Sequence, residues 1–372
     1  MIAAPKQETI DVISDTPRAT WPTGEPGLTR QYATVCGFQM SYVTGGQGAP
    51  IILIHGLGSD GANWRKVLPL LAEHYTVYAV DLLGCGESDK PPIAYTIEAF
   101  AHYLRFFMDA VGIERAHLFG HSLGGGVALQ TLYFSPDRVD RVVLVDSGGL
   151  GRDVHWLLRI STLPGADQVI NLMSNPRSGI TTLARRLEQR AKGQSDEAYQ
   201  AEIAGMLEKL RVSDARRSFL RMVRAIGSLS GQTVSALPHL AAQEKTPFLL
   251  IWGEKDAIIP LSHGRSAHAL LSRSHLEIIP NSFHQPHIEQ PSEVAHLMLD
   301  FLTAETWPPE EKMVHVPDAT QTTRRPNKNW RRIAPVAVAA ASIPTGLTML
   351  YNRRKRILAS AARSHASIPT YD

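Results

Sequence analysis

"LFGHSLGGGVAL" (Leu118–Leu129) is the stretch that decides the fold of this 372-residue chain. It begins as a short apolar run and continues as a helix-like segment, with Ser122 at the junction between Gly120 and Gly124. Glycine removes the Cβ atoms that would clash in a very tight strand-to-helix turn. The G-x-S-x-G pattern therefore predicts a turn that presents a serine hydroxyl at the carboxyl edge of a sheet. The alternative is a glycine-rich helix start with Ser122 as a simple N-cap.

Apolar runs alternate with helical segments on both sides of this stretch. Strands are predicted at 50–56, 75–84, 116–120, 141–148, 247–253 and 275–280, and helices at 64–74, 97–112, 123–135 and 292–302. An antiparallel pair is expected within 30–46, where Gly37 separates two short runs. The pattern is typical of an α/β fold with a mostly parallel, doubly wound sheet covered by helices on both faces.

The strand pattern stops between Gly149 and Thr246, where the chain is helical in pattern and rich in arginine and leucine. This interruption predicts an inserted helical cap. The expected organisation is a flexible arm at 1–30, core at 31–149, cap at 150–245, core at 246–303, and a linker with a basic, partly apolar tail at 304–372. Most apolar cap residues are expected to form its core, and a few to line a pocket for an acyl chain or an aromatic acid: Met173, Leu183, Leu187, Leu207, Leu220 and Met222.

The composition excludes several kinds of site. The chain has only two cysteines, Cys36 and Cys85, and no Cys/His cluster with the spacing of metal ligands. We therefore expect no metal site, no disulfide framework and a reducing, cytoplasmic compartment. The N-terminus also lacks the basic and apolar regions of a secretory signal.

The tail has an uneven charge. Residues 320–372 carry ten basic residues and one acid, although the whole chain has a net charge of only +3. Within it, 333–351 is uncharged and almost long enough to span a bilayer, but Pro335 and Pro344 interrupt it. We expect a basic tail or interfacial helix that contacts an anionic membrane surface, with a C-terminal anchor as the alternative. No motif supports nucleic-acid binding, and the oligomeric state is left open.

Two polar residues follow later predicted strands, in the chain order serine, aspartate, histidine that is typical of this kind of serine turn. "WGEKDAIIP" places Asp256 after one predicted strand, and "NSFHQPHIEQP" places His284 after the next. A neutral serine hydroxyl is a poor nucleophile, so it needs a histidine base that a carboxylate orients. Because parallel strands end at one edge of the sheet, we expect Ser122, His284 and Asp256 to meet there.

Three residues compete for these roles. Asp146, at the end of the strand "VVLVD", is the alternative acid. His287 follows His284 closely and is expected to support the helix entry. His121 is expected to pack, since neighbouring residues on a tight turn point apart.

The loop "HGLGSDGANW" (55–64) leaves the first parallel strand and is rich in glycine. The backbone N–H groups of Leu57 and Leu123 are the expected donors to an oxyanion that develops during the reaction. His55 is expected to brace this loop.

Taken together, five motifs make the chain similar to the α/β-hydrolase fold superfamily from about Gln31 to Thr303: "HGLG", "DLLGCGESDKP", "GHSLGGG", "WGEKDAIIP" and "HQPHIEQP". The resemblance implies a serine hydrolase without metal or organic cofactor. It implies Ser122 as nucleophile, His284 as base, Asp256 as acid, and Leu57 and Leu123 as oxyanion-hole amides.

Fold alone does not choose the substrate. Ser122 disfavours the haloalkane dehalogenase and epoxide hydrolase branches, which have aspartate at this position. "DSGGLG" and "GEKDAIIPLSHG" resemble the carbon–carbon hydrolases of aromatic ring-cleavage products, whereas "HQPHIE" and "HGLG" depart from them. We therefore expect a hydrolase of small acyl or lipid-like carboxylic esters. A hydrolase of 2-hydroxy-6-oxo-dienoates is the alternative, and a perhydrolase, an acyltransferase or a non-catalytic receptor are further options.

Overall fold

The structure is a computed structural model that describes residues 27–174, 207–305 and 307, all within the unit Met1–His315. Several predictions fall outside these residues and stay predictions. They are the first 26 residues of the predicted arm, the cap residues Leu183 and Leu187, the side chain of Met173, and the tail with its uncharged segment 333–351.

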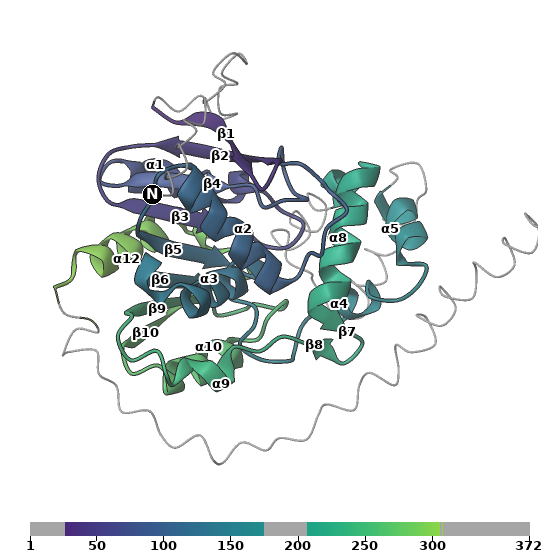
Figure 1. Cartoon of the computed structure of the whole chain (residues 1–372). Helices are drawn as coiled ribbons and strands as arrows, with labels where there is room; N and C mark the ends of the chain where they lie inside the picture. The colour runs from purple at the N-terminus through teal and green to yellow at the C-terminus, as the bar shows by residue number, and fades with distance from the viewer. Residues whose placement is uncertain (1–26, 175–206, 306, 308–372) are drawn as a thin grey trace, which may run out of the picture. The chain divides into compact units, whose positions relative to one another are not determined.

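Eight strands form one sheet in the order β1-β2-β4-β3-β5-β6-β9-β10 (Figure 1). Their bounds are β1 Thr29–Val35, β2 Phe38–Gly45, β3 Pro50–Ile54, β4 Thr76–Val80, β5 Ala116–His121, β6 Val139–Val145, β9 Phe248–Gly253 and β10 Ser274–Ile279. Neighbours from β4 to β10 pair in parallel, whereas β1 and β2 add an antiparallel pair at the β4 edge. The predicted mostly parallel sheet is confirmed.

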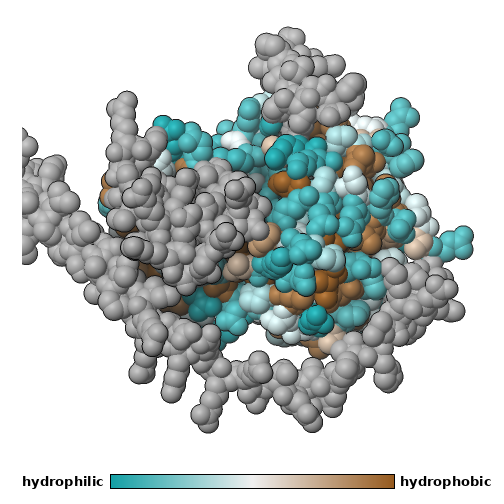
Figure 2. All heavy atoms as spheres, turned by 180° about the vertical axis from the view of Figure 1, so that it is seen from behind, coloured by the Kyte–Doolittle hydropathy of each residue, from teal (hydrophilic) through white to brown (hydrophobic). Residues whose placement is uncertain are grey.

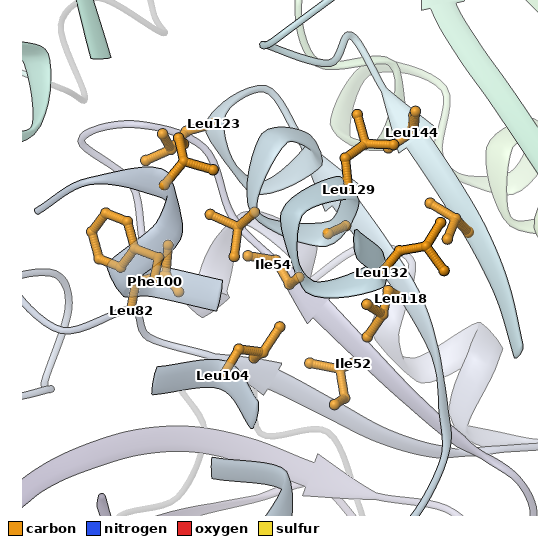
Figure 3. Close-up of a cluster of buried hydrophobic side chains, with 14 of the residues drawn as sticks. Ile52, Ile54, Leu82, Phe100, Leu104, Leu118, Leu123, Leu129, Leu132 and Leu144 are labelled. Carbon is orange, nitrogen blue, oxygen red and sulfur yellow. The ribbon is translucent and has the colours of Figure 1, made fainter. Parts of the chain in front are cut away.

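Helices cover both faces of the sheet. They are α1 Leu68–Ala72 and α12 Pro291–Thr303 on one face, and α2 Ile97–Ala110, α3 Leu123–Phe134 and α10 Leu261–Leu270 on the other. Alternate residues of β3 divide between the two cores: Ile52 and Ile54 pack toward α2 and α3, and Ile51 and Leu53 toward α1 and α12. Figure 3 shows the first of these cores. The continuous apolar run of β3 follows from this burial on both faces.

Some boundaries differ from the predictions. The helix expected at 64–74 is shorter, because a 3-10 turn at Gly61–Trp64 precedes α1, which begins at Leu68. Pro69 explains this start, since proline has no N–H to donate and suits the first turn of a helix. Helix α10 was not predicted. Gly264 in its middle and its polar composition hide the helical period.

The described part of the chain between β6 and β9, residues 146–174 and 207–247, contains helices and one small hairpin. The elements are α4 Trp156–Ile160, α5 Ala166–Ser174, α8 Ser213–Ile226, β7 Gly227–Ser228, β8 Gly231–Gln232 and α9 Leu237–Leu240. Figure 1 shows α4, α5 and α8 grouped at one side of the sheet, and Ile170, Phe219 and Val223 belong to a small core of their own. The sequence did not predict this hairpin. Its strands have two residues each, which is too short to show the alternating pattern of a strand.

The surface of the described chain is mixed. Seen from behind Figure 1, hydrophilic residues surround smaller hydrophobic patches (Figure 2). No helix among the described residues is long and apolar enough to cross a bilayer.

Candidate active site

Ser122 lies at the turn from β5 into α3 and has a strained backbone. Its φ is 52° and its ψ is −115°, a conformation that residues other than glycine rarely adopt. The turn is held by backbone hydrogen bonds: the Ser122 N–H donates to the Val145 carbonyl at 3.0 Å, and the Ser122 carbonyl accepts from Gly125 and Gly148 at 3.0 and 2.8 Å. The side chain makes no capping hydrogen bond to α3. The conformation therefore does not support the N-cap alternative.

Close backbone contacts explain the glycines beside Ser122. A Cβ atom at Gly120 would clash with the backbone of Gly124, and a Cβ atom at Gly124 would clash with the carbonyl of Ile54. Glycine at both positions lets α3 begin directly against β3 and β5.

Asp256 and His284 meet at the carboxyl end of the sheet. Asp256 follows β9, and its Oδ2 lies 2.8 Å from His284 Nδ1, with both side chains almost completely buried. The other carboxylate oxygen, Oδ1, accepts backbone N–H groups of Ile258 and Ile259 at 2.7 and 3.0 Å. The carboxylate is thus fixed by its own loop and can hold the imidazole in one orientation.

Glu289 braces the loop that carries His284. Its carboxylate accepts hydrogen bonds from the Ser282 hydroxyl at 2.7 Å and from the N–H groups of Phe283 and Gln285 at 2.7 and 3.2 Å. The sequence reasoning missed this residue. The signal in the sequence was an acidic residue, Glu289, a few positions after the loop 282–285, whose backbone N–H groups have no neighbouring strand to pair with.

His121 connects the serine turn to the His284 loop. Its Nε2–H donates to the His284 carbonyl at 2.7 Å, and its ring lies 4.9 Å from the His284 ring. Burial lowers the pKa of His121 well below its usual value, and the nearby charges of His287 and His284 lower it further. The ring is therefore neutral and committed to a backbone carbonyl, which agrees with a packing role and disfavours a role as base.

His287 supports the same loop from the other side. Its Nε2–H donates to Asn63 Oδ1 at 2.8 Å, and Asn63 Nδ2 donates in turn to Gln285 Oε1 at 2.9 Å. Burial, together with the charge of His284, lowers the pKa of His287 to about 3. This arrangement agrees with the expected supporting role at the helix entry.

Asp146 occupies a different position from Asp256. It is fully buried, has a positive φ of 44°, and accepts the Gly253 N–H at 2.9 Å through Oδ1. Burial raises the pKa of Asp146 well above its usual value, and the neighbouring charge of Asp256 raises it further. A carboxyl group that keeps its proton stabilises an imidazolium less than a carboxylate does.

His121, Asp146 and His284 bring possible metal-ligand atoms within 4.8 Å of one another. Three features argue against a cation there. The His121 Nε2 donates to a carbonyl, the His284 Nδ1 is paired with Asp256, and a raised pKa favours the neutral, weakly coordinating form of Asp146, although His121 Nδ1 and Asp146 Oδ2 have no hydrogen-bond partner among the described residues. This donor set suits a hydrogen-bonded base better than a metal.

Leu57 and Leu123, the predicted oxyanion donors, line the same cavity as Ser122. Leu57 follows β3 after Gly56, and Leu123 is the first residue of α3, where helix N–H groups lack intrahelical acceptors. His55 braces the loop, because its Nδ1–H donates to the Gly56 carbonyl at 2.7 Å and its Nε2 accepts the Leu82 N–H at 3.1 Å.

Ser122 and Leu57 line two cavities. One has a volume of about 310 Å³ and extends past Leu123 and Leu129 toward the β7–β8 hairpin. The other has a volume of about 570 Å³ and includes His284 together with residues of α5 and α8. Ser122 thus lies between two spaces that can hold two parts of one molecule.

Comparisons with known proteins identify the fold family of the chain. A family model described as "alpha/beta hydrolase fold" matches residues 49–291. The uncharacterized protein Rv2715 of Mycobacterium tuberculosis is 36% identical over 276 residues, which cover 74% of this chain and 81% of that relative. The 2-hydroxy-6-oxo-6-(2'-aminophenyl)hexa-2,4-dienoic acid hydrolase of Metapseudomonas resinovorans is 28% identical over 283 residues, covering 75% and 92%. The solved structure of a membrane phospholipase A, a bacterial virulence factor, is 26% identical with a TM-score of 0.58, covering 74% and 86%.

Proposed function

Because this chain belongs to the α/β-hydrolase fold family, we propose that it is a serine hydrolase that cleaves carboxylic esters through an acyl-enzyme on Ser122. The observation that carries the proposal is the buried pair of His284 and Asp256, 2.8 Å apart, with His284 lining the same cavity as a serine in a strained turn. This pairing orients a base toward a displayed nucleophile. The substrate class is a small acyl or lipid-like ester.

The first half of the reaction transfers the acyl group. His284 takes the Ser122 proton as the Oγ attacks the ester carbonyl carbon, and the carbonyl oxygen becomes an oxyanion. The Leu57 and Leu123 N–H groups stabilise that charge. As the carbon–oxygen bond breaks, His284 returns the proton to the leaving alkoxide, which departs as an alcohol. Asp256 stabilises the imidazolium throughout.

The second half uses water. His284 removes a proton from water, and the resulting hydroxide attacks the acyl carbon through a second oxyanion. The bond to Ser122 Oγ breaks and the serine regains its proton from His284. The acid product then leaves, and the site returns to its initial state.

The two cavities divide the substrate. His284 must reach the leaving oxygen to protonate it, and it lines the cavity of about 570 Å³. The leaving alcohol therefore occupies that cavity, and the acyl group occupies the cavity of about 310 Å³ beside Leu123, which we call the acyl cavity. Leu158 of α4 borders both, which supports the proposal that 150–245 act as a cap over the site.

A carbon–carbon hydrolase is the second candidate. It is favoured by the 28% identity to a hydrolase of a 2-hydroxy-6-oxo-dienoic acid, over nearly the whole of that relative. Similarity to a membrane phospholipase A favours the hypothesis of an ester hydrolase.

An activity screen separates the two candidates. It compares p-nitrophenyl esters of increasing acyl length, monoacylglycerols and a 2-hydroxy-6-oxo-dienoate, with Ser122→Ala as the blank. We expect Ser122-dependent turnover of the esters to exceed turnover of the dienoate. Exclusive turnover of the dienoate would establish the second candidate instead.

We also propose that the basic tail brings the domain to an anionic membrane surface. The test is sedimentation with vesicles containing anionic lipid, for the full chain and a chain ending at residue 319. The proposal predicts that the full chain binds and that the shortened chain does not. Equal sedimentation of the two would contradict it.

A further inference from the structure

The side-chain amide of Gln232 in β8 has a paired oxygen and, within the described part of the chain, an unpaired nitrogen. Its Oε1 accepts the Gly149 N–H at 2.8 Å, which fixes the orientation of the amide. Its Nε2 is buried and has no hydrogen-bond partner among the described residues. A buried donor without a partner destabilises the folded state, so its presence here calls for an explanation.

The amide lies beside the reacting serine. Gln232 lines the acyl cavity together with Ser122 and Gly148. The Gly148 N–H donates to the Ser122 carbonyl at 2.8 Å, and a Cβ atom at Gly148 would lie 3.3 Å from both Gln232 Oε1 and the Ser122 carbonyl oxygen. Ser122 and Gln232 thus lie on either side of Gly148 in the wall of one cavity, where an acyl group on Ser122 can come close to this amide.

The surroundings indicate a neutral ligand group. Apolar side chains form much of the cavity wall, including Leu129 and Val234. One carboxylate, Glu98, and one cation, Arg159, also line it, and the Arg159 guanidinium donates to the Val154 carbonyl at 2.8 Å and to the Asp153 carboxylate at 3.2 Å. Its charge is partly offset there, whereas the Gln232 amide supplies a donor without charge.

We propose that Gln232 Nε2 is a specificity-determining donor that binds an uncharged oxygen on the acyl group of the substrate. The preferred substrates are then esters of acids with a keto, hydroxy or ether oxygen, rather than of plain fatty acids. This inference rests on the proposed function, which assigns the acyl group of the substrate to the acyl cavity. A site built to bond a polar group discriminates strongly against an analogue that lacks it, because its own donor is then left unpaired.

The test measures binding without turnover, in the full chain with Ser122→Ala. The ligands are p-nitrophenyl hexanoate and a series of analogues in which each acyl methylene in turn is replaced by an ether oxygen or a carbonyl. Dissociation constants are measured by calorimetry in three backgrounds. Gln232→Glu keeps an acceptor for the Gly149 N–H but removes the donor, Gln232→Met removes both, and Gln130→Met removes another amide of the same cavity as the matched control.

We expect at least one oxygen-bearing analogue to bind about 10-fold more tightly than hexanoate, a difference of about 1.4 kcal/mol. Gln232→Glu and Gln232→Met should abolish this preference, and Gln130→Met should keep it. The inference is overturned if hexanoate binds as well as every analogue, or if Gln232→Glu keeps the preference, since the amide would then only brace Gly149. The proposed function fails separately if the protein with Ser122 intact hydrolyses none of these esters.

Discussion

Two carboxyl groups near His284 differ in their partners, and this difference leads us to predict different roles for them. Asp256 contacts the imidazole directly, whereas Asp146 contacts a backbone amide and has a raised pKa that favours its neutral form. We predict that Asp256→Asn lowers kcat on a p-nitrophenyl ester by about 10³-fold or more, because the amide favours the wrong imidazole tautomer. Asp146→Asn should stay within about 10-fold of the wild type. The opposite order of the two losses would make Asp146 the acid.

Asp146 also predicts a pH dependence of stability. Its pKa is raised in the folded chain above the usual 3.8, so the folded state binds a proton that the unfolded state releases near neutral pH. The contribution of Asp146 to the stability of the wild type therefore falls as the pH rises above its usual pKa of 3.8. Asparagine carries no such penalty and keeps an acceptor for the Gly253 N–H.

Urea unfolding of the wild type and Asp146→Asn at pH 4.5, 6 and 8 measures this effect. The free energy of unfolding of the variant, relative to the wild type, should rise with pH. A difference that is constant, or that grows as the pH falls, would show that Asp146 is charged in the folded chain.

At the scale of elements, the short helix α11 (Pro286–Glu289) holds the base in place through Glu289. We predict that Glu289→Gln lowers kcat by about 10- to 100-fold with little change in KM, because a shift of the His284 loop misplaces the base. Glu293→Gln, in the first turn of α12, is the control and should leave kcat unchanged. If the two variants have equal activity, Glu289 does not position His284.

The start of α3 gives a matched pair of glycine substitutions. Gly124→Ala places a Cβ atom against the Ile54 carbonyl, so we predict a loss of stability of several kcal/mol, about the size of an overpacked core site. Gly126→Ala places its Cβ atom at ordinary distances from Ile97 and Gly148, and alanine favours helix by about 0.8–1 kcal/mol. Thermal melting should therefore separate the two variants clearly. Equal melting temperatures would contradict the close contact between α3 and β3.

Local sequence patterns predict some of these elements and not others. The strands β3 to β6 are continuous apolar runs that need cover on both faces, so their position and order follow directly from the sequence. Helix α10 carries Gly264 and an irregular apolar pattern, and its packing against β9, β10 and α9 stabilises it. Tertiary contacts decide such elements, and no local pattern records them.

At the scale of the whole molecule, the site combines residues that are far apart in the chain. Ser122, Asp256 and His284 could be predicted because each follows a strand and parallel strands end together. Glu289 and Gln232 could not, because their roles depend on which backbone amides happen to lie within reach after folding. The cavities likewise arise where loops of the sheet meet helices from the segment between β6 and β9.

The most direct test of the account is covalent labelling of the full chain with a fluorophosphonate, followed by mass spectrometry of the peptides. The account predicts a single adduct on Ser122, which is lost in Ser122→Ala and much slower to form in His284→Gln, because the hydroxyl then lacks its base. Equal labelling of the wild type and Ser122→Ala would contradict the central claim that Ser122 is the nucleophile.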